Sequence, residues 1–468
     1  MLIVLMIRQN VVQLELAPNL ITECKNYVQN KFRVKNAKFF DSEAIVGHVY
    51  DFSVLSAVYN YYFQNSNKIF IDYFKEFLYK DFEHISVSPI IKKSFDNFYK
   101  PKIEFWEALL SPKSKWGFVG DPHNQSVKIK YRNNIYYNKV LDYELFINSV
   151  LKVIPTFENL FPKTVVKNDI CIRKYKKFYD GDVDEHAYYY NFGKLLAFAV
   201  FFRSIDLNFE NFMIIDKATP YVFDLEFLFA AFEDYTTEYT GLISKVVEDN
   251  TSAILGGLNR KVYSYLKPVV FGDVNGKNPT IKWKVPSKRK LINIPKGSQK
   301  HPFEYIDEIT SGMKYAFKEL LNHKHVLFEL VSSINIITRF IVRPTRVYRY
   351  AYLEYAYPQV YLEKGFREVL REQLESIDII SNINVSYDVK KIVHYEVDTL
   401  ELLSIPFYYT NIKERYIYSD KGDIVGFLER TPYDIWVDWI NRLGNGGYEA
   451  EIGVVRMLLK GNYNTSAN

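Results

Sequence analysis

The chain has 468 residues, which is long enough for two or three packed subdomains. Apolar residues make up 48% and charged residues 25%, the balance of a globular protein, and the net charge of +5 is spread along the chain. Because an even spread of charge argues against a nucleic-acid groove, we expect no nucleic-acid partner.

Two features bear on the compartment. The two cysteines, Cys24 and Cys171, form no CxxC pair, which disfavours a disulfide framework and a cysteine zinc site. The apolar run Met1–Ile7 ends at Arg8, and no other uncharged stretch reaches the roughly 20 residues that a spanning helix needs. We therefore expect no membrane span and a cytoplasmic protein.

The first 115 residues are predicted to be mainly helical, because apolar residues recur at helical spacing in segments such as Ala44–Phe63 and Ile69–Tyr79. The pattern then changes to alternation. Val127–Tyr131 and Ile135–Lys139 flank a turn-forming tripeptide, which predicts a β-hairpin. A helix over Tyr143–Val153 should follow.

The middle of the chain is predicted to combine a buried helix with a short hairpin. His186–Arg203 has apolar residues on nearly every face, which is typical of a helix surrounded by protein. A loop over Ser204–Asn211 and two short strands, Phe212–Ile215 and Tyr221–Phe223, should come next.

Residues 230–300 contain many glycines and prolines and are predicted to be irregular, as a functional loop or an insertion. Helical periodicity returns over Phe303–Ile334 and over Glu363–Ile377. Gly461–Asn468 is expected to be a frayed tail.

Three polar residues around the predicted central hairpin have the spacing of a phosphoryl-transfer site. In protein kinases a catalytic-loop Asp is followed five positions later by a metal-binding Asn, and a second metal-binding Asp lies beyond the next hairpin. Asp206, Asn211 and Asp224 follow that order. Mg²⁺ prefers carboxylate and amide oxygens, so Asn211 and Asp224 are candidate ligands, and Asp206 is a candidate base for the acceptor hydroxyl. The structural alternative is that these Asp and Asn side chains only cap turns.

Five sequence blocks, taken in order, extend this pattern over most of the chain. They are Gly120-Asp121-Pro122-His123, Gly193-Lys194-Leu195-Leu196 leading into Asp206–Asn211, Val222-Phe223-Asp224-Leu225-Glu226, Arg339–Tyr348 with Arg343-Pro344-Thr345 inside it, and Tyr395-Glu396 followed by Ser404-Ile405-Pro406-Phe407-Tyr408. With these blocks the chain resembles the dehydratase domain of class II lanthipeptide synthetases.

The resemblance implies an α+β fold with a kinase-like two-lobed core and additional helical N-terminal and C-terminal elaborations. Residues 1–115 would form the helical N-terminal region, 116–190 the N-lobe, and 191–468 the C-lobe, with an insertion at about 230–300 and the elimination-site elements. Enzymes of this family use ATP and Mg²⁺ to phosphorylate Ser and Thr of a ribosomal precursor peptide that carries a leader. They then eliminate the phosphate to leave dehydroalanine or dehydrobutyrine.

The resemblance also implies roles for individual residues. Asp206, Asp121, His123, Arg339 and Thr345 would be catalytic, Lys139, Asn208 and Glu226 would bind the cofactor, and Asn211 and Asp224 would bind the metal. Arg339 and Thr345 belong to the elimination step, where an arginine suits a leaving phosphate because it binds phosphate bidentately. On the residues alone, Arg339 could instead form a surface salt bridge, and Thr345 could cap a helix.

The chain departs from the family pattern at two positions. Asn208 stands where the family has a histidine, and an amide cannot carry a proton charge. The family's strand-end lysine corresponds to Asn138 or, shifted by one residue, to Lys139, and such a shift turns a strand side chain to the other face. No zinc-binding cyclase domain precedes Asn468, so a separate cyclase is an expected partner. A kinase without elimination and an inactive peptide-binding scaffold are the alternative functions.

Overall fold

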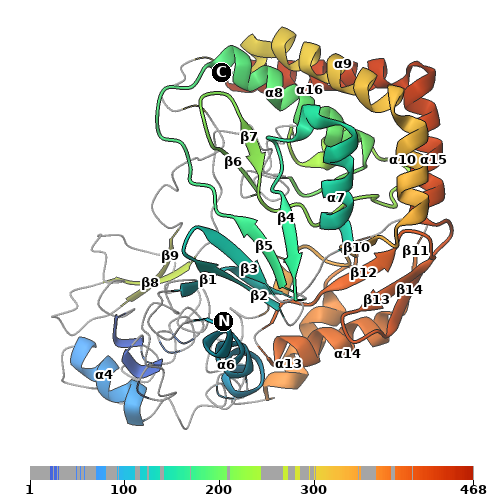
Figure 1. Ribbon diagram of the computed structural model, residues 1–468. Helices are drawn as coiled ribbons and strands as arrows, with labels where there is room; N and C mark the ends of the chain where they lie inside the picture. Colours follow the sequence, from blue (N-terminus) through green and yellow to red (C-terminus); the bar gives the residue numbers. More distant parts are fainter. Residues whose placement is uncertain are drawn as a thin grey trace.

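The protein is described from a computed structural model. The described residues are 70–80, 94–110, 116–123, 126–137, 142–168, 170–207, 211–243, 267–271, 280–284, 302–345, 365–380, 385–402 and 404–466. Shorter stretches are described at 22–24, 26–28 and 347–348, and single positions at 30, 49, 53, 57, 92, 295, 300 and 351. Within this part of the chain, helices and antiparallel sheets are combined, which confirms the α+β prediction (Figure 1).

The first sheet is antiparallel and has the order β1-β2-β3-β5-β4. Its strands are β1 (Trp116–His123), β2 (Ser126–Tyr131), β3 (Asn134–Tyr137), β4 (Thr164–Lys167) and β5 (Ile170–Lys174). The predicted hairpin is confirmed as β2–β3, in which Ile129 lies opposite Tyr136. The turn residue Arg132 has a positive φ of 53°. The described part of β3 ends at Tyr137, so the predicted strand end at Lys139 lies outside the described residues.

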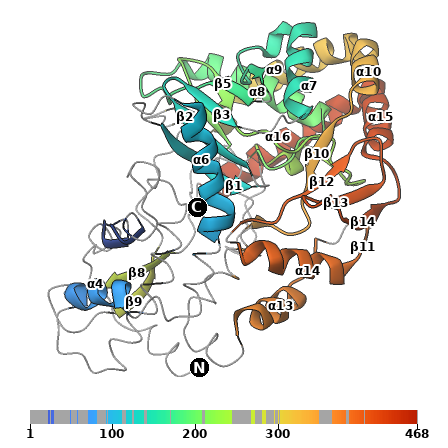
Figure 2. The same cartoon turned by 60° about the horizontal axis from the view of Figure 1, so that its bottom comes forward.

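Helices cover both faces of this sheet (Figure 2). On one face, Trp106 of α6 (Lys100–Leu109) packs edge-on against Tyr136, with ring centroids 6.5 Å apart. The neighbouring residue Tyr137 points to the other face, where its hydroxyl donates a hydrogen bond to Glu144 of α7 (Asp142–Val153). The prediction of a helix at Tyr143–Val153 is confirmed.

The N-terminal region is helical wherever the structure describes it. It contains α4 (Phe70–Lys80), the π-helix η3 (Phe95–Tyr99) and α6. The predicted segment Ile69–Tyr79 corresponds to α4, whereas only single positions of Ala44–Phe63 are described.

Long helices supply much of the main hydrophobic core and lie along the top and one side of the molecule in Figure 1. They are α8 (Glu185–Phe201), α9 (Ile306–Asn322), α10 (Lys324–Ser333), α15 (Pro432–Arg442) and α16 (Tyr448–Ser466), with short 3₁₀ turns at Pro155–Phe157 and Pro302–Tyr305 and a π turn at Leu443–Gly447. The helix α8 is buried on all sides over residues 195–201, as predicted, whereas His186 near its start is exposed. It begins where the Asp184 carboxylate accepts a hydrogen bond from the Ala187 amide at 3.1 Å. The chain is helical to Ser466, so the prediction of a frayed tail from Gly461 is wrong.

The rest of the described chain forms two small hairpins and a second sheet. The central hairpin, β6 (Phe212–Ile214) with β7 (Pro220–Val222), is confirmed. Residues 230–300, predicted to be irregular, contain the 3₁₀ turn Thr237–Thr240 and a regular hairpin of β8 (Lys267–Phe271) with β9 (Thr280–Lys284). The second sheet has the order β10-β12-β13-β14-β11, with β10 (Ile337–Phe340), β11 (Val385–Tyr387), β12 (Tyr408–Asn411), β13 (Tyr416–Ser419) and β14 (Ile424–Leu428).

Two helices accompany the second sheet, α13 (Phe366–Ser376) and α14 (Val389–Leu400). The first confirms the helical prediction for Glu363–Ile377, and the helices α9 and α10 confirm that for Phe303–Ile334 with a break at His323. Within the described residues, no helix has both the length and the apolar character that crossing a bilayer requires.

Two glycines allow α8 and α9 to approach closely. A Cβ atom added at Gly193 would lie 2.0 Å from the carbonyl oxygen of Ile309, and one at Gly312 would lie 2.0 Å from that of Tyr190. Real Cβ atoms do not come this close to a backbone oxygen. The packing of α8 against α9 therefore requires a glycine at position 193, at the start of the Gly193–Leu196 block.

We predict that Gly193→Ala destabilises the protein, because the new methyl group has no space between α8 and α9. Overpacking of this kind costs about 1–3 kcal/mol in the free energy of unfolding, which denaturant-induced unfolding would measure. Gly453→Ala in α16 is the matched control, since nothing lies within 4 Å of its added Cβ. This control should be neutral or slightly stabilising. Equal stability of the two variants would contradict the predicted clash.

Candidate functional site

The loop after α8 presents Asp206 to solvent in a fixed backbone conformation. Asp206 has a φ of +63°, in the left-handed region that non-glycine residues seldom adopt. The next residue, Leu207, is buried, and its amide donates to the carbonyl of Thr240 at 2.8 Å. A residue held in this strained region between anchored neighbours is typical of functional sites.

Arg203 and Ser204, at the start of this loop, form hydrogen bonds with the segment that follows β7. The Arg203 side chain is buried, donates to the backbone carbonyls of Ala230 (2.8 Å) and Phe232, and lies 4.6 Å from the ring centroid of Tyr235. The Ser204 hydroxyl donates to the carbonyl of Phe227 at 2.9 Å. Burial lowers the pKa of Arg203 to about 10, so the side chain still carries its charge at neutral pH. These contacts tie the loop to the segment that follows β7.

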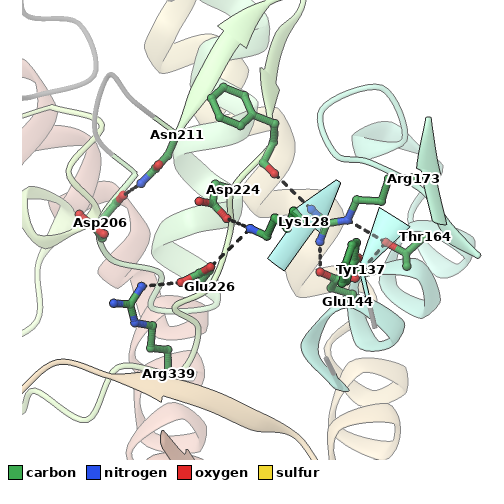
Figure 3. Close-up of polar contacts among 11 residues, drawn as sticks. Lys128, Tyr137, Glu144, Thr164, Arg173, Asp206, Asn211, Asp224, Glu226 and Arg339 are labelled. Atoms are coloured by element: carbon green, nitrogen blue, oxygen red, sulfur yellow. Dashed lines mark hydrogen bonds and ion pairs between the residues drawn. The ribbon is translucent and has the colours of Figure 1, made fainter. Parts of the chain in front are cut away.

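The hairpin β6–β7 brings Asn211 next to Asp224. Since Phe212 pairs with Val222, Asn211 lies opposite Phe223, and its carbonyl accepts hydrogen bonds from the amides of Phe223 (3.1 Å) and Asp224 (3.3 Å). The Asn211 side-chain amide donates to the backbone carbonyl of Asp206 at 2.5 Å. The structure thus brings together the three residues selected by their spacing (Figure 3).

Lys128, which the sequence analysis did not select, forms a charged cluster with Asp224, Glu226 and Arg339. It reaches from β2 so that its Nζ lies 3.0 Å from Oδ1 of Asp224 and 3.6 Å from Oε1 of Glu226 (Figure 3). Its side chain is 26% exposed, and those of Asp224 and Glu226 are 34% and 12% exposed. The sequence of β2 contained a sign of this position. Side chains alternate along a strand, so Lys128 and Lys130 share the face opposite to that of Ile129, which is fully buried.

Arg339 lies on the other side of Glu226. Its Nη1 donates to Oε2 of Glu226 at 2.5 Å, and its backbone amide donates to the Glu226 carbonyl at 3.3 Å. The Arg339 side chain is only 13% exposed and packs over the rings of Phe227 and Phe407. Arg339 therefore forms a salt bridge, as the structural alternative expected, but a partly buried one and not one at the surface.

The charges of the cluster compensate one another. Burial, reinforced by the Glu226 carboxylate, raises the pKa of Asp224 above its ordinary value, although Lys128 opposes this. Burial lowers the pKa of Lys128, but the two carboxylates outweigh it and hold that pKa above the ordinary value. Glu226 likewise outweighs burial at Arg339, with further contributions from Asp206 and Asp224, so the pKa of the guanidinium is raised. Both cations keep their charge at neutral pH.

A second polar network supports the cluster from the first sheet. Arg173 of β5 pairs with Glu144 of α7, donates through Nη1 to the carbonyl of Phe223 at 3.2 Å, and donates through Nε to Thr164 at 3.2 Å. The hydroxyls of Tyr137 and Thr164 also donate to Glu144. Arg173 thereby joins the first sheet, α7 and the residue before Asp224 (Figure 3).

The other predicted site residues are placed as follows. Asp121 and His123 lie on β1, where the register with β2 is irregular between Val119 and His123. Asn208 and Lys139 lie outside the described residues. Thr345 begins a helical turn after β10, and within the described part of the chain no hydrogen bond joins it to Arg339.

Other residues of the matched blocks hold the fold together. Arg343 and Glu396 are fully buried, with Nε of Arg343 3.1 Å from both carboxylate oxygens, and the Tyr348 hydroxyl donates to Glu396 at 2.8 Å. The Tyr395 hydroxyl donates to the carbonyl of Phe407 and accepts from its amide, both at 3.1 Å. These contacts join the Arg343 block to the Tyr395–Tyr408 block around a buried ion pair.

The donor set of the cluster fits Mg²⁺ bound together with phosphate oxygens. Within the described residues, no group of three or more His, Cys, Asp or Glu side chains could hold a metal ion by itself. The amide nitrogen of Asn211 faces the Asp206 carbonyl, which leaves its oxygen, with the Asp224 carboxylate, as the hard ligands. Mg²⁺ in nucleotide sites usually has one or two protein ligands and completes its shell with phosphate and water.

Residues 179–411 match the model of a family described as a domain of unknown function, DUF4135, which is associated with lanthionine synthetase-like proteins. The match spans just under half of the chain. It includes Asp206, Asn211, Asp224, Glu226 and Arg339, whereas Lys128 and the rest of β1–β3 precede it. No curated protein matches the chain.

We predict that Glu396→Ala lowers the free energy of unfolding by about 3–5 kcal/mol, because it leaves the buried guanidinium of Arg343 without its counter-ion. Glu396→Gln should cost less, since the amide oxygen still accepts hydrogen bonds from Arg343 and Tyr348. Urea unfolding would measure both. Glu375→Ala, at an exposed position of α13, is the control and should change stability by less than about 0.5 kcal/mol. The ion pair would be dispensable if Glu396→Ala unfolded like this control.

Proposed function

We propose that this chain is an ATP-dependent peptide dehydratase with a kinase-like two-lobed core. It phosphorylates Ser and Thr of a ribosomal precursor peptide and then eliminates the phosphate to give dehydroalanine and dehydrobutyrine. The observation that carries the proposal is the continuous line of contacts Asp224–Lys128–Glu226–Arg339, next to the Asp206 loop. It sets a candidate phosphate-donor site beside a candidate site for the leaving phosphate. The match of residues 179–411 to a domain associated with lanthionine synthetase-like proteins points to the same class of proteins.

In the first step, Asp206 orients the Ser or Thr hydroxyl and accepts its proton as the oxygen attacks the γ-phosphorus of ATP. The bond from this phosphorus to the β-phosphate oxygen breaks, and ADP leaves with the electron pair. Asn211 and Asp224 would hold Mg²⁺, which neutralises phosphate charge when bound. The exposed position of Asp206 suits this role, because a peptide hydroxyl can reach it.

In the second step, the α-proton of the phosphorylated residue passes to a base, and the electrons of the Cα–H bond form the double bond. The Cβ–O bond breaks, and phosphate leaves with its electron pair. Arg339 stabilises the charge on that phosphate, since a guanidinium binds phosphate oxygens through paired N–H donors. Glu226 holds the guanidinium in place before the phosphate arrives. A separate cyclase would act on the dehydrated peptide.

We predict that Asp206→Ala lowers magnesium-dependent ATP turnover by at least about a hundredfold, because general-base catalysis typically contributes a hundredfold or more. Arg339→Ala should still consume ATP but accumulate phosphorylated peptide. Mass spectrometry of a candidate precursor peptide, incubated with each variant, would separate the gain of phosphate from the loss of water.

Arg371→Ala, at an exposed position of α13, is the control for the arginine change and should dehydrate the peptide like the wild type. A wild-type product that keeps its phosphate would identify a kinase without elimination. The absence of magnesium-dependent ATP turnover with the peptide present would identify a binding scaffold. Normal dehydration by both site variants would show that the roles are assigned to the wrong residues.

A further inference from the structure

The lysine that contacts nucleotide phosphates in protein kinases lies on the third strand of the N-lobe and pairs with a glutamate of the following helix. In this chain the third strand is β3 and the following helix is α7, whose buried glutamate is Glu144. That carboxylate already receives hydrogen bonds from Tyr137 of β3, from Thr164 of β4 and from Arg173 of β5. Tyr137 of β3 and Arg173 of β5 therefore contact the glutamate of the following helix, as the lysine does in protein kinases.

A lysine on the neighbouring strand points to the same face of the sheet. Ile129 of β2 pairs with Tyr136 of β3, so Lys128 is the cross-strand neighbour of Tyr137 one residue further on. Paired residues of antiparallel strands share a face, and adjacent residues alternate. Ile129 and Tyr136 point toward Trp106 of α6, so Lys128 and Tyr137 point away from it, toward Glu144 and Asp224.

We propose that Lys128, delivered from β2, is the residue that contacts the phosphates of the bound nucleotide, the role expected of Lys139. This inference rests on the proposed function and names the cationic ligand of its nucleotide. The side chain is long and flexible and remains 26% exposed, and its ammonium lies 3.0 Å from the Asp224 carboxylate expected to hold Mg²⁺. Asp224 and Glu226 hold the ammonium in place.

Lys130 provides an internal comparison. It lies on the same face of β2, two residues further along, but its Nζ lies 3.5 Å from the ring centroid of Tyr175. It thus contacts an aromatic ring, whereas Lys128 contacts the acidic cluster. Substituting Lys128 and Lys130 in turn removes the same charge from the same strand, so a difference between the two variants reports the position of the lysine.

The test measures binding of ATP with Mg²⁺ by calorimetry, and ADP formation with the peptide, for the wild type and for Lys128→Met, Lys130→Met and Lys139→Met. We expect Lys128→Met to reduce turnover by about a hundredfold, the loss typical of removing one donor to a developing charge. Lys130→Met should stay within about threefold of the wild type, because the Lys130 ammonium contacts the Tyr175 ring and not the acidic cluster. Lys139→Met should stay in the same range, since the inference assigns the phosphate contact to Lys128. Loss of turnover in Lys139→Met with normal activity in Lys128→Met would overturn the inference and leave the proposed function intact.

A second measurement uses only the wild type, because Lys128→Met also removes the counter-ion of two carboxylates. Lysines are acetylated with an amine-directed reagent with and without ATP and Mg²⁺, and labelling is read by peptide mass spectrometry. We expect the nucleotide to protect Lys128 severalfold and to leave Lys130 unchanged. Protection of Lys139 in place of Lys128 would overturn the inference alone. A wild type that binds no ATP would overturn both the inference and the proposed function.

Discussion

The electrostatic balance around Glu226 is the constraint on which the candidate site depends. Asp224 and Glu226 are two residues apart in the segment after β7, and both are partly buried, so their charges would repel without compensation. The compensating cations come from elsewhere in the chain: Lys128 from the first sheet and Arg339 from the second. The acidic segment after β7 therefore holds one strand of each sheet beside it. The fold and the charge balance of the site depend on the same contacts.

Buried charges of this kind stabilise a structure only when their hydrogen-bonding capacity is fully used. Glu144 meets that condition with Arg173, Tyr137 and Thr164 as donors, and Arg173 uses another N–H on the Phe223 carbonyl. Arg203 donates from Nε and Nη2 to two backbone carbonyls on the Asp206 side of the site. These networks fix the residues that flank Asp206 and Asp224. Preorganised polar groups are the arrangement that stabilises transferring phosphate most effectively.

Local patterns predicted much of this arrangement, and non-local contacts account for what they missed. The hairpin β2–β3, the buried helix α8 and the grouping of Asp206, Asn211 and Asp224 follow from alternation, periodicity and spacing within short stretches. The pairing of Arg339 with Glu226 joins residues 113 positions apart, and no short pattern encodes it. The second sheet was missed for the same reason, since β11 pairs with β14 across a helix and two other strands. Arg343 and Glu396 belonged to matched blocks, but only the structure gives them a buried, structural role.

The role inferred for Lys128 illustrates how a neighbouring strand can supply the same charge. Along β3, a shift of one residue from Tyr137, whose hydroxyl contacts Glu144, reverses the direction of the side chain. A shift across the sheet does not: Lys128, the cross-strand neighbour of Tyr137 on β2, keeps the same face, and the Cβ atoms of such neighbours lie about 5 Å apart. A lysine side chain spans that offset, so the charge can reach the same place from either strand. Since sequence motifs record order along the chain, such a replacement leaves the motif broken while the cation remains beside Asp224.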